Sequence, residues 1–263
     1  MTKTSGRPDL LTADELEAYR RFDSVTLFFT RAEIEGSIGE DYTGPEIRCM
    51  YPELGPVVGY AVTSEWTTLD AESPDLNFLD YYEWITGQPA PRVVVNMDAD
   101  ERTGRTASFG GMQARTLRRL GVAGVVSTIG LHKVSAVRAA GMPLWTTGIA
   151  PAHGSYHLVR YGAPVSVGRV TWRTGDLVFA DENGAIRIPA KLAREVLHKA
   201  QDGAGRETSY YEVIDAPDFT VAKLREWLAG HATIYPPVNE EMAERWWAKN
   251  SHRLAPRSEG ISK

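Results

Sequence analysis

The segment 92–147 alternates short apolar runs with helix-like stretches, and this alternation limits the chain to few folds. The runs Arg92–Met97 and Val122–Ser127 are almost continuously apolar, which is typical of strands buried on both faces. A β–α–β–α–β order implies parallel strands joined by right-handed crossovers, so we expect an α/β fold. The predicted elements are, in order, a strand over Arg92–Met97, a helix over Met112–Leu120, a strand over Val122–Ser127, a helix that ends near Gly141 and a strand over Pro143–Thr147.

Local signals predict further elements on both sides of this segment. Thr12 and Glu15 have the spacing of a capping box, which predicts a helix through Arg21. The apolar stretch Phe22–Phe29 fits a strand or a helix, and its periodicity does not choose between them. From residue 158 the pattern changes to hairpins. The remaining predictions are a strand over Pro56–Ser64, a helix over Asp80–Thr86 that ends at Gly87, hairpin strands over Pro164–Thr171, Asp176–Ala180 and Ala185–Pro189 with a turn at Asp181–Gly184, and an exposed helix over Lys191–Ala200.

Composition and charge narrow the functional classes. The net charge of −5 provides no basic surplus, so we expect no nucleic-acid partner. Cys49 is the single cysteine and cannot form an internal disulfide, which fits a reducing compartment. Met1–Leu11 has no apolar targeting region, and no run approaches the ~20 apolar residues of a membrane span. We therefore expect a cytoplasmic protein that does not associate with membranes.

We divide the chain into three parts. Residues 1–45 form an N-terminal helix and loop, residues 46–200 the core domain, and residues 201–263 a charged, tryptophan-rich extension with helical stretches at 220–229 and 239–249. Trp145, Trp172 and the C-terminal tryptophans Trp227, Trp246 and Trp247 are expected to leave apolar surface that requires cover. This surface predicts an assembly of several copies.

Residues 91–189 resemble the core of the RraA-like family, which includes hydroxymethyl-oxoglutarate and carboxy-hydroxy-oxoadipate aldolases. TGDLVFADENGAIRIP (174–189) is close to the family pattern P-G-D-L-V-x-A-D-x-x-G-V-x-x-x-P. PRVVVNMD (91–98), FGGMQARTLRRLGVAGVVS (109–127) and GMPLWTTGIAPAHG (141–154) resemble its strand before the site, its Gly-rich turn with the following helix and strand, and its third core strand with the following loop. DELEAYRRFDSVTL (14–27) fits its opening helix more loosely.

The resemblance implies a swivelling β/β/α domain, a homo-trimer or dimer of trimers, and active sites between subunits. It also implies retro-aldol cleavage or decarboxylation of 2-oxo acids, helped by a divalent metal such as Mg²⁺ that stabilises the pyruvate enolate. In the family, the carboxylate of the acid binds backbone N–H groups at the helix start after the Gly-rich turn.

In this chain those donors would come from Gly111, Met112 and Gln113, next to Gly110. The first N–H groups of a helix have no intrahelical partner and face the positive end of the helix dipole, which favours an anion. The competing interpretation is that the glycines only let the strand and the helix pack closely.

The chain departs from the family where the family has D-G-x-x-R-D. Here the stretch is Thr128–Lys133, with His132 in place of the substrate-binding Arg and Lys133 in place of the metal-binding Asp. A Lys ammonium has donors and no lone pair, so it cannot ligate magnesium. We therefore expect no metal ligand here and a metal-independent site in which Lys133 acts as a fixed cation or as a Schiff-base amine, with His132 binding the carboxylate or moving the proton. The competing interpretation is an inactive site with Lys133 as a solvated surface residue.

Other side chains near the predicted site have a functional and a plain interpretation. His153 and His157 are candidate acid/base groups or surface histidines. Asp98 ends the first core strand, and Arg105 follows in a charged stretch that could supply the missing guanidinium or be solvated. We expect Asp181 to be a turn former whose carboxylate bonds backbone N–H groups.

Three functions follow from these observations. The first is a divergent enzyme, a C–C lyase or decarboxylase that acts on a small 2-oxo acid or related carboxylate without metal. The second is a non-catalytic binding or regulatory protein on the same fold. The third is a conventional aldolase that uses a divalent metal, which the gap-free spacing from Gly110 to Gly141 disfavours.

Overall fold

The computed structural model describes residues 10–100, 105–231, 241, 244–245 and 248–249. It divides the chain into two compact units, Met1–Asp202 and Gly203–Lys263. The strands are β1 (Arg48–Cys49), β2 (Val57–Thr67), β3 (Arg92–Asp98), β4 (Ala107–Phe109), β5 (Val122–Ser127), β6 (Gly130–Leu131), β7 (Leu144–Thr146), β8 (His157–Tyr161), β9 (Val165–Val167), β10 (Val170–Trp172), β11 (Leu177–Asp181) and β12 (Gly184–Ile188). The α-helices are α1 (Ala13–Tyr19), α2 (Ser24–Glu35), α3 (Phe78–Thr86), α4 (Gly111–Arg119), α5 (Val134–Ala139), α6 (Ala193–Asp202), α7 (Arg206–Ile214) and α8 (Val221–Gly230).

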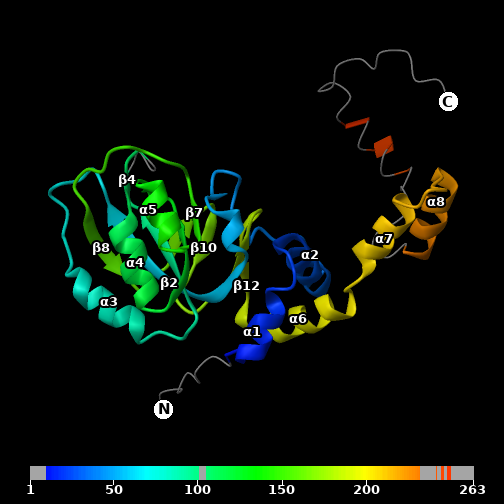
Figure 1. Cartoon of the computed structure of the whole chain (residues 1–263), viewed down its shortest axis with the longest axis horizontal. Coiled ribbons are helices and arrows are strands. Elements are labelled where there is room, and N and C mark those ends of the chain that lie inside the picture. The colour runs from blue at the N-terminus through cyan, green and yellow to red at the C-terminus, as the bar shows by residue number, and fades with distance from the viewer. Residues whose placement is uncertain (1–9, 101–104, 232–240, 242–243, 246–247, 250–263) are drawn as a thin grey trace. The chain divides into compact units, whose positions relative to one another are not determined.

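The first unit is built on one mixed sheet in the order β1-β7-β5-β3-β2-β11-β12, with β8 paired to β2 as well. Strands β2, β3, β5 and β7 run parallel to one another, and the other pairs in this sheet are antiparallel. The predicted α/β fold and the parallel β3–β5–β7 core are therefore confirmed. Helices α3, α4 and α5 lie together on one side of the unit in Figure 1, and α1, α2 and α6 lie together on the other.

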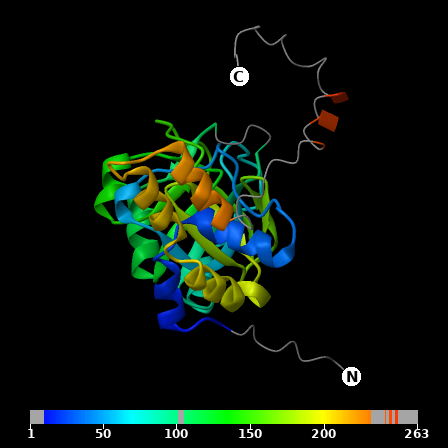
Figure 2. The same ribbon diagram turned by 90° about the vertical axis from the view of Figure 1, so that its right-hand side faces the viewer.

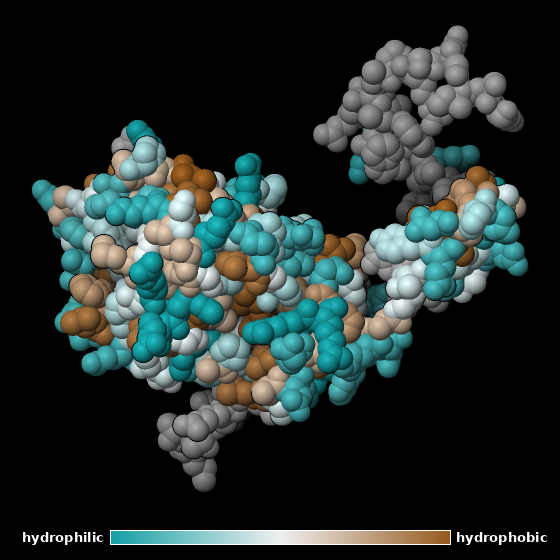
Figure 3. Space-filling view, viewed as in Figure 1, coloured by the Kyte–Doolittle hydropathy of each residue, from teal (hydrophilic) through white to brown (hydrophobic). Residues whose placement is uncertain are grey.

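The core has three apolar clusters. One packs α3, α4 and α5 against β2, β3 and β5, and a second packs α1, α2 and α6 against β2, β11 and β12. The third fills the space between the sheet and the β9–β10 hairpin, and contains Trp145 and Trp172. Figure 3 shows brown, hydrophobic residues only in separate groups among hydrophilic ones on the face towards the viewer.

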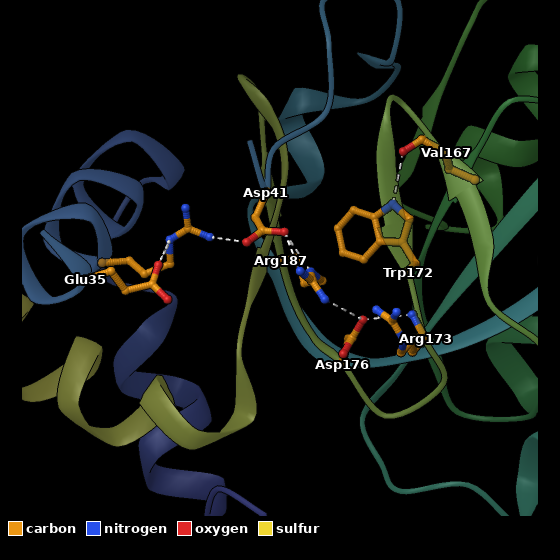
Figure 4. Close-up of polar contacts among 8 residues, drawn as sticks. Glu35, Asp41, Val167, Trp172, Arg173, Asp176 and Arg187 are labelled. Atoms are coloured by element: carbon orange, nitrogen blue, oxygen red, sulfur yellow. Dashed lines mark hydrogen bonds and ion pairs between the residues drawn. The ribbon is translucent and has the colours of Figure 1, made fainter. Parts of the chain in front are cut away.

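Trp145 and Trp172 correct our expectation of an apolar surface in need of cover. Both side chains are fully buried within the chain. The indole N–H of Trp145 donates to the carbonyl of Asp181, and that of Trp172 donates to Val167 (Figure 4). The sequence could not reveal this because burial of a tryptophan depends on which hairpin covers it. Trp246 and Trp247 lie outside the described residues.

The structure decides one helix that the sequence left open and corrects another. Of the ambiguous stretch Phe22–Phe29, residues 24–29 are helical and belong to α2, whose N-cap residue Asp23 accepts a hydrogen bond from the Thr26 N–H at 2.7 Å. Helix α6 is not an exposed helix, because Val196 and Leu197 on one face are buried against the sheet layer. The predicted capping box of α1 is present, with both Thr12–Glu15 bonds formed.

A row of alternating charges links α2 and the segment after it to β12 (Figure 4). Figure 2 turns the side of the unit with α1, α2 and α6 towards the viewer. The buried Arg31 on α2 donates to Asp41 at 2.6 Å, and Asp41 also accepts from Arg187 on β12 at 2.9 Å. Arg187 in turn lies 3.6 Å from Asp176. The burial of the Arg31 guanidinium and the partial burial of that of Arg187 are tolerated here because each has a carboxylate partner.

The second unit contains α7 and α8. The indole N–H of Trp227 donates to the Ser209 hydroxyl at 3.2 Å, and the Trp227 ring stacks on His231 at 3.9 Å. Helix α8 confirms the predicted helix at 220–229. The predicted helix at 239–249 lies only partly within the described residues. The predicted domain boundaries at residues 45 and 200 stay predictions. Among the residues that the structure describes, no helix combines the length and apolarity needed to cross a bilayer.

Candidate functional site

The site is assembled beyond the carboxyl ends of the parallel strands, where α/β proteins place their ligands. A small second sheet, missed by the sequence analysis, pairs β4 with β6 in parallel, with Ala107 opposite Gly130. The His132 N–H donates to the Phe109 carbonyl at 3.0 Å. This pairing brings the glycine turn that follows β4 next to the His132–Lys133 segment that follows β6.

The glycine turn starts helix α4. Gly110 is the N-cap residue, with φ −141° and ψ −176°, and no side chain of the described residues caps this end. The first intrahelical bond is donated by Ala114 to the Gly110 carbonyl, so the N–H groups of Gly111, Met112 and Gln113 have no helical acceptor. Their arrangement agrees with the predicted anion-binding position, whose occupation by a carboxylate stays a prediction.

The same glycines also pack closely. A Cβ at Gly110 would lie 2.7 Å from the Nε2 atom of His132, and a Cβ at Gly111 would lie 2.7 Å from the Cβ of Ala136 on α5. The competing packing interpretation is therefore correct as a description of these contacts. It does not exclude anion binding, because close packing involves the Cα atoms whereas the anion would bind the N–H groups.

His132 lies at the centre of the site. Its ring centroid is 5.7 Å from that of His153, which the loop after β7 carries. Burial lowers the pKa of His132, a hydrogen bond to the Ser108 backbone opposes this, and the charges of His153 and Lys133 lower the pKa further. A histidine with a lowered pKa is neutral at physiological pH and can accept a proton.

Lys133 has an unusual backbone. Its φ of 51° and ψ of 48° lie in the left-handed region, and its side chain is exposed at the N-cap of α5. Arg169 is the other non-glycine residue with positive φ in the part of the chain described. A left-handed non-glycine residue costs about 1 kcal/mol or more, and such strain is found preferentially at functional positions.

Tyr156 and Ser108 are additions that the sequence analysis missed. The Gln113 side chain donates to the Tyr156 hydroxyl, and the Tyr156 ring stacks on Trp66 with centroids 4.4 Å apart. Burial raises the pKa of Tyr156 well above its ordinary value, so this hydroxyl stays neutral, and it also bonds the Ser108 side chain. Nothing in the local pattern around residue 156 indicates these contacts, because they join segments far apart in the chain.

Three other predicted residues have different surroundings. The Asp98 carboxylate accepts from the Asp100 N–H at 3.1 Å and so serves a local turn at the end of β3. His157 lies on β8, where its Nδ1 is 3.0 Å from the Ser73 hydroxyl rather than beside His132. Arg105 is exposed before β4.

Met112 and Asp181 complete the predicted set. Met112 is 86% exposed on the first turn of α4, so its backbone N–H borders the site while its side chain faces outward. Asp181 accepts from the Asn183 N–H at 2.9 Å, which confirms the predicted turn role, and from the Ser24 N–H at 2.7 Å.

The residues around the glycine turn do not fit a magnesium ion. The side chains that flank it are two imidazoles and one ammonium, whereas Mg²⁺ is held by carboxylate and other oxygen ligands. Within the described ranges, no three His, Cys, Asp or Glu side chains gather in a group that could hold a metal ion.

A comparison with protein families identifies the family of this chain. The profile of the RraA-like family, described as Aldolase/RraA, matches residues 33–187. Protein DlpA of Legionella pneumophila is 28% identical over 145 residues, which cover 54% of this chain and 23% of that protein. The chain thus spans about a quarter of the length of this curated relative.

Two solved structures share the fold. RraAS2 of Streptomyces coelicolor, named as an unusual member of the RNase ES inhibitor RraA family, is 25% identical with a TM-score of 0.63, over 75% of this chain and 96% of that one. An uncharacterized protein of Pseudomonas syringae pv. tomato is 19% identical with a TM-score of 0.67, over 86% of this chain and 99% of that one. Because the family profile covers more than half of the sequence and the observed sheet and helices have the corresponding fold, this chain belongs to the RraA-like family.

Proposed function

We propose that this protein is a divergent aldolase-like enzyme that acts on a small 2-oxo acid, as a C–C lyase or decarboxylase, without a metal ion. One observation carries the proposal: the β4–β6 pairing holds the uncapped start of α4 against His132, which Lys133 follows in the chain. We infer that the exposed Lys133 side chain adds a cation to the anion donors and the neutral base of this turn. The strained backbone of Lys133 supports it, because the fold would be more stable with glycine there.

The chemistry follows from these groups. The N–H groups of Gly111, Met112 and Gln113 bind the carboxylate, and His132 removes a proton from the carbon next to the carbonyl. Negative charge then develops on the carbonyl oxygen. An Asp and a divalent cation together present a net charge of about +1, and a protonated Lys133 presents the same, so the ammonium can stabilise the enolate. Alternatively, Lys133 condenses with the carbonyl and releases water to form a Schiff base.

The test uses pyruvate in D₂O, with exchange of its methyl protons followed by NMR, and oxaloacetate, with release of CO₂. Lys133→Ala should lower both rates by about a hundredfold or more, since a preorganised charge is lost. Lys133→Arg separates the two roles, because Arg keeps the charge but cannot form a Schiff base. Borohydride with pyruvate, followed by intact mass, detects the covalent adduct directly. Wild-type rates in Lys133→Ala would remove this residue from the mechanism.

The proposed metal independence has its own measurement. Activity should be unchanged after treatment with a chelator, because the flanking side chains are not magnesium ligands. Loss of activity in chelator that Mg²⁺ or Mn²⁺ restores would instead support a conventional metal aldolase. We further propose that the enzyme is cytoplasmic and works as a homo-trimer or dimer of trimers, without nucleic-acid or membrane partners.

A second candidate function, a non-catalytic binding or regulatory protein, is favoured by a separate observation. An apolar groove of about 250 Å³ lies between α2 and β12, and is bordered by Val25, Phe29 and Tyr42, with Phe29 53% exposed. Exposed apolar grooves of this kind bind other proteins. RraAS2 is named as a member of a ribonuclease-inhibitor family. A ribonuclease inhibition assay with wild type and Phe29→Glu tests this function independently of Lys133.

A further inference from the structure

His132 and His153 form a pair with one ring half-buried and the other exposed. Their ring centroids are 5.7 Å apart and their planes are inclined by 35°. The backbone holds them there, because the Ala107 N–H on β4 donates to the Ala152 carbonyl at 2.9 Å while the His132 N–H donates to Phe109. A proton can pass between imidazoles at this separation through one bridging water molecule.

The hydrogen bonds of the two rings define which nitrogens are free. The Nδ1 of His153 lies 3.2 Å from the Gly154 carbonyl, which can only accept, so Nδ1 carries the proton and Nε2 is the free acceptor. One nitrogen of His132 bonds the Ser108 backbone carbonyl and likewise carries a proton. Each neutral ring therefore keeps one nitrogen available to take a proton.

We propose that His153 is a proton relay that carries the proton removed by His132 to solvent. This inference rests on the proposed function. His132 takes a proton from the carbon next to the carbonyl, and the electron pair of that C–H bond becomes the enolate, with its charge on the carbonyl oxygen. The imidazolium then passes a proton to Nε2 of His153, which releases one to water, and both rings return to neutral.

The charges around the pair favour this direction of transfer. Burial, together with the charges of His153 and Lys133, lowers the pKa of His132 and so disfavours a lasting imidazolium there. Burial raises the pKa of Tyr156, which bonds the Ser108 side chain, so this hydroxyl is neutral. His153 is exposed to solvent, where its charged form is hydrated. The relay therefore moves the proton from a position that disfavours positive charge to one that tolerates it.

The experiment compares two reactions in wild type, His153→Ala and His198→Ala. His198 is exposed on α6 and serves as a matched control. Exchange of pyruvate methyl protons in D₂O requires the removed proton to reach solvent, whereas release of CO₂ from oxaloacetate requires no proton removal. In dilute non-nucleophilic buffer, the His153→Ala variant should exchange the pyruvate methyl protons at least about tenfold more slowly than wild type. Its rate of CO₂ release from oxaloacetate should stay within about twofold of wild type. Added imidazole should restore exchange.

Each other outcome has a defined meaning. Equal exchange in His153→Ala and wild type overturns the relay and leaves the proposed function intact. Slow exchange that imidazole does not restore, or an equal loss of CO₂ release, shows a structural role and also overturns the relay. If wild type neither exchanges pyruvate nor decarboxylates oxaloacetate, the proposed function fails and the relay fails with it.

Discussion

Gly110 and His132 are in direct contact, and a Cβ at position 110 would lie 2.7 Å from both Cε1 and Nε2 of the imidazole. The backbone of Gly110 is extended, with φ −141°, so alanine can adopt it without strain. Gly110→Ala should therefore change the free energy of unfolding by less than about 1 kcal/mol, since a side-chain ring can rotate away. The displaced ring should lower pyruvate exchange at least about tenfold. Urea unfolding and NMR exchange check the two effects, and full activity would contradict the assigned position of His132.

Gly111 differs from Gly110 in what it contacts. A Cβ there would lie 2.7 Å from the Cβ of Ala136, so Gly111→Ala forces α4 and α5 apart and should cost about 1–3 kcal/mol. A double-mutant cycle with Ala136→Gly measures this contact. We expect the second substitution to be less destabilising in the Gly111→Ala background than in wild type, because it removes the overlap. Additive effects would show that the helices do not meet here.

The left-handed backbone of Lys133 should lower the free energy of unfolding, although its side chain contributes to the proposed activity. Lys133→Gly removes the left-handed strain and should raise the free energy of unfolding by about 1 kcal/mol, but lower turnover about a hundredfold or more. Arg169→Gly is the matched control, because Arg169 has φ 69° and a side chain that is 80% exposed. It should stabilise similarly with no loss of activity. Retained activity in Lys133→Gly would leave the strain without a function.

The lowered pKa of His132 makes a prediction with a definite sign. The folded protein binds a proton at His132 less tightly than the unfolded chain does. Protonation of His132 therefore leaves the free energy of unfolding unchanged well above pH 6.5 and lowers it as the pH falls below that value. His153→Gln removes one nearby imidazole and should raise the pKa of His132. An NMR titration of the imidazole signals, assigned with His132→Gln, measures the change. A lower pKa in His153→Gln would show that the rings do not interact as the structure indicates.

The carboxylate of Asp100 closes the loop after β2 and should contribute to stability in a pH-dependent way. It accepts hydrogen bonds at 2.7 Å from both the N–H and the hydroxyl of Thr68. Burial raises the pKa of Asp100, but the hydrogen bonds that its carboxylate accepts from Thr67 and Thr68 lower it overall. The stabilisation is therefore present above the ordinary aspartate pKa and lost as the pH falls towards the folded value. Asp100→Asn should be about 1–2 kcal/mol less stable at pH 7, with a smaller difference near pH 3 in urea titrations.

The predicted assembly of several copies no longer depends on the buried tryptophans. Since Trp145 and Trp172 are buried within one chain, they give no reason for further copies. The expected trimer or dimer of trimers depends on the resemblance to ring-forming relatives alone. Light scattering across a dilution series checks it, and a monomer mass at every concentration would contradict it.

The sequence by itself determined the elements whose signals are local. The apolar runs Arg92–Met97 and Val122–Ser127 are the parallel strands β3 and β5, and the Thr12–Glu15 spacing starts α1, because periodicity and capping depend on residues a few positions apart. The family motif at 174–189 likewise marked the β11–β12 hairpin.

Only the tertiary structure decided which side chains meet. The β4–β6 pair is too short to show a period, yet it places Gly110 against His132. His153, in the loop after β7, lies beside His132. His157, four residues later, is the first residue of β8 and lies beside Ser73, because the chain has entered a strand by then. Trp172 is buried because the β9–β10 hairpin that carries it packs against the sheet. The contact of Tyr156 with Gln113 joins residues 43 positions apart in the chain. Tertiary packing rather than local propensity makes these long-range contacts, and for this reason no pattern of neighbouring residues indicates them.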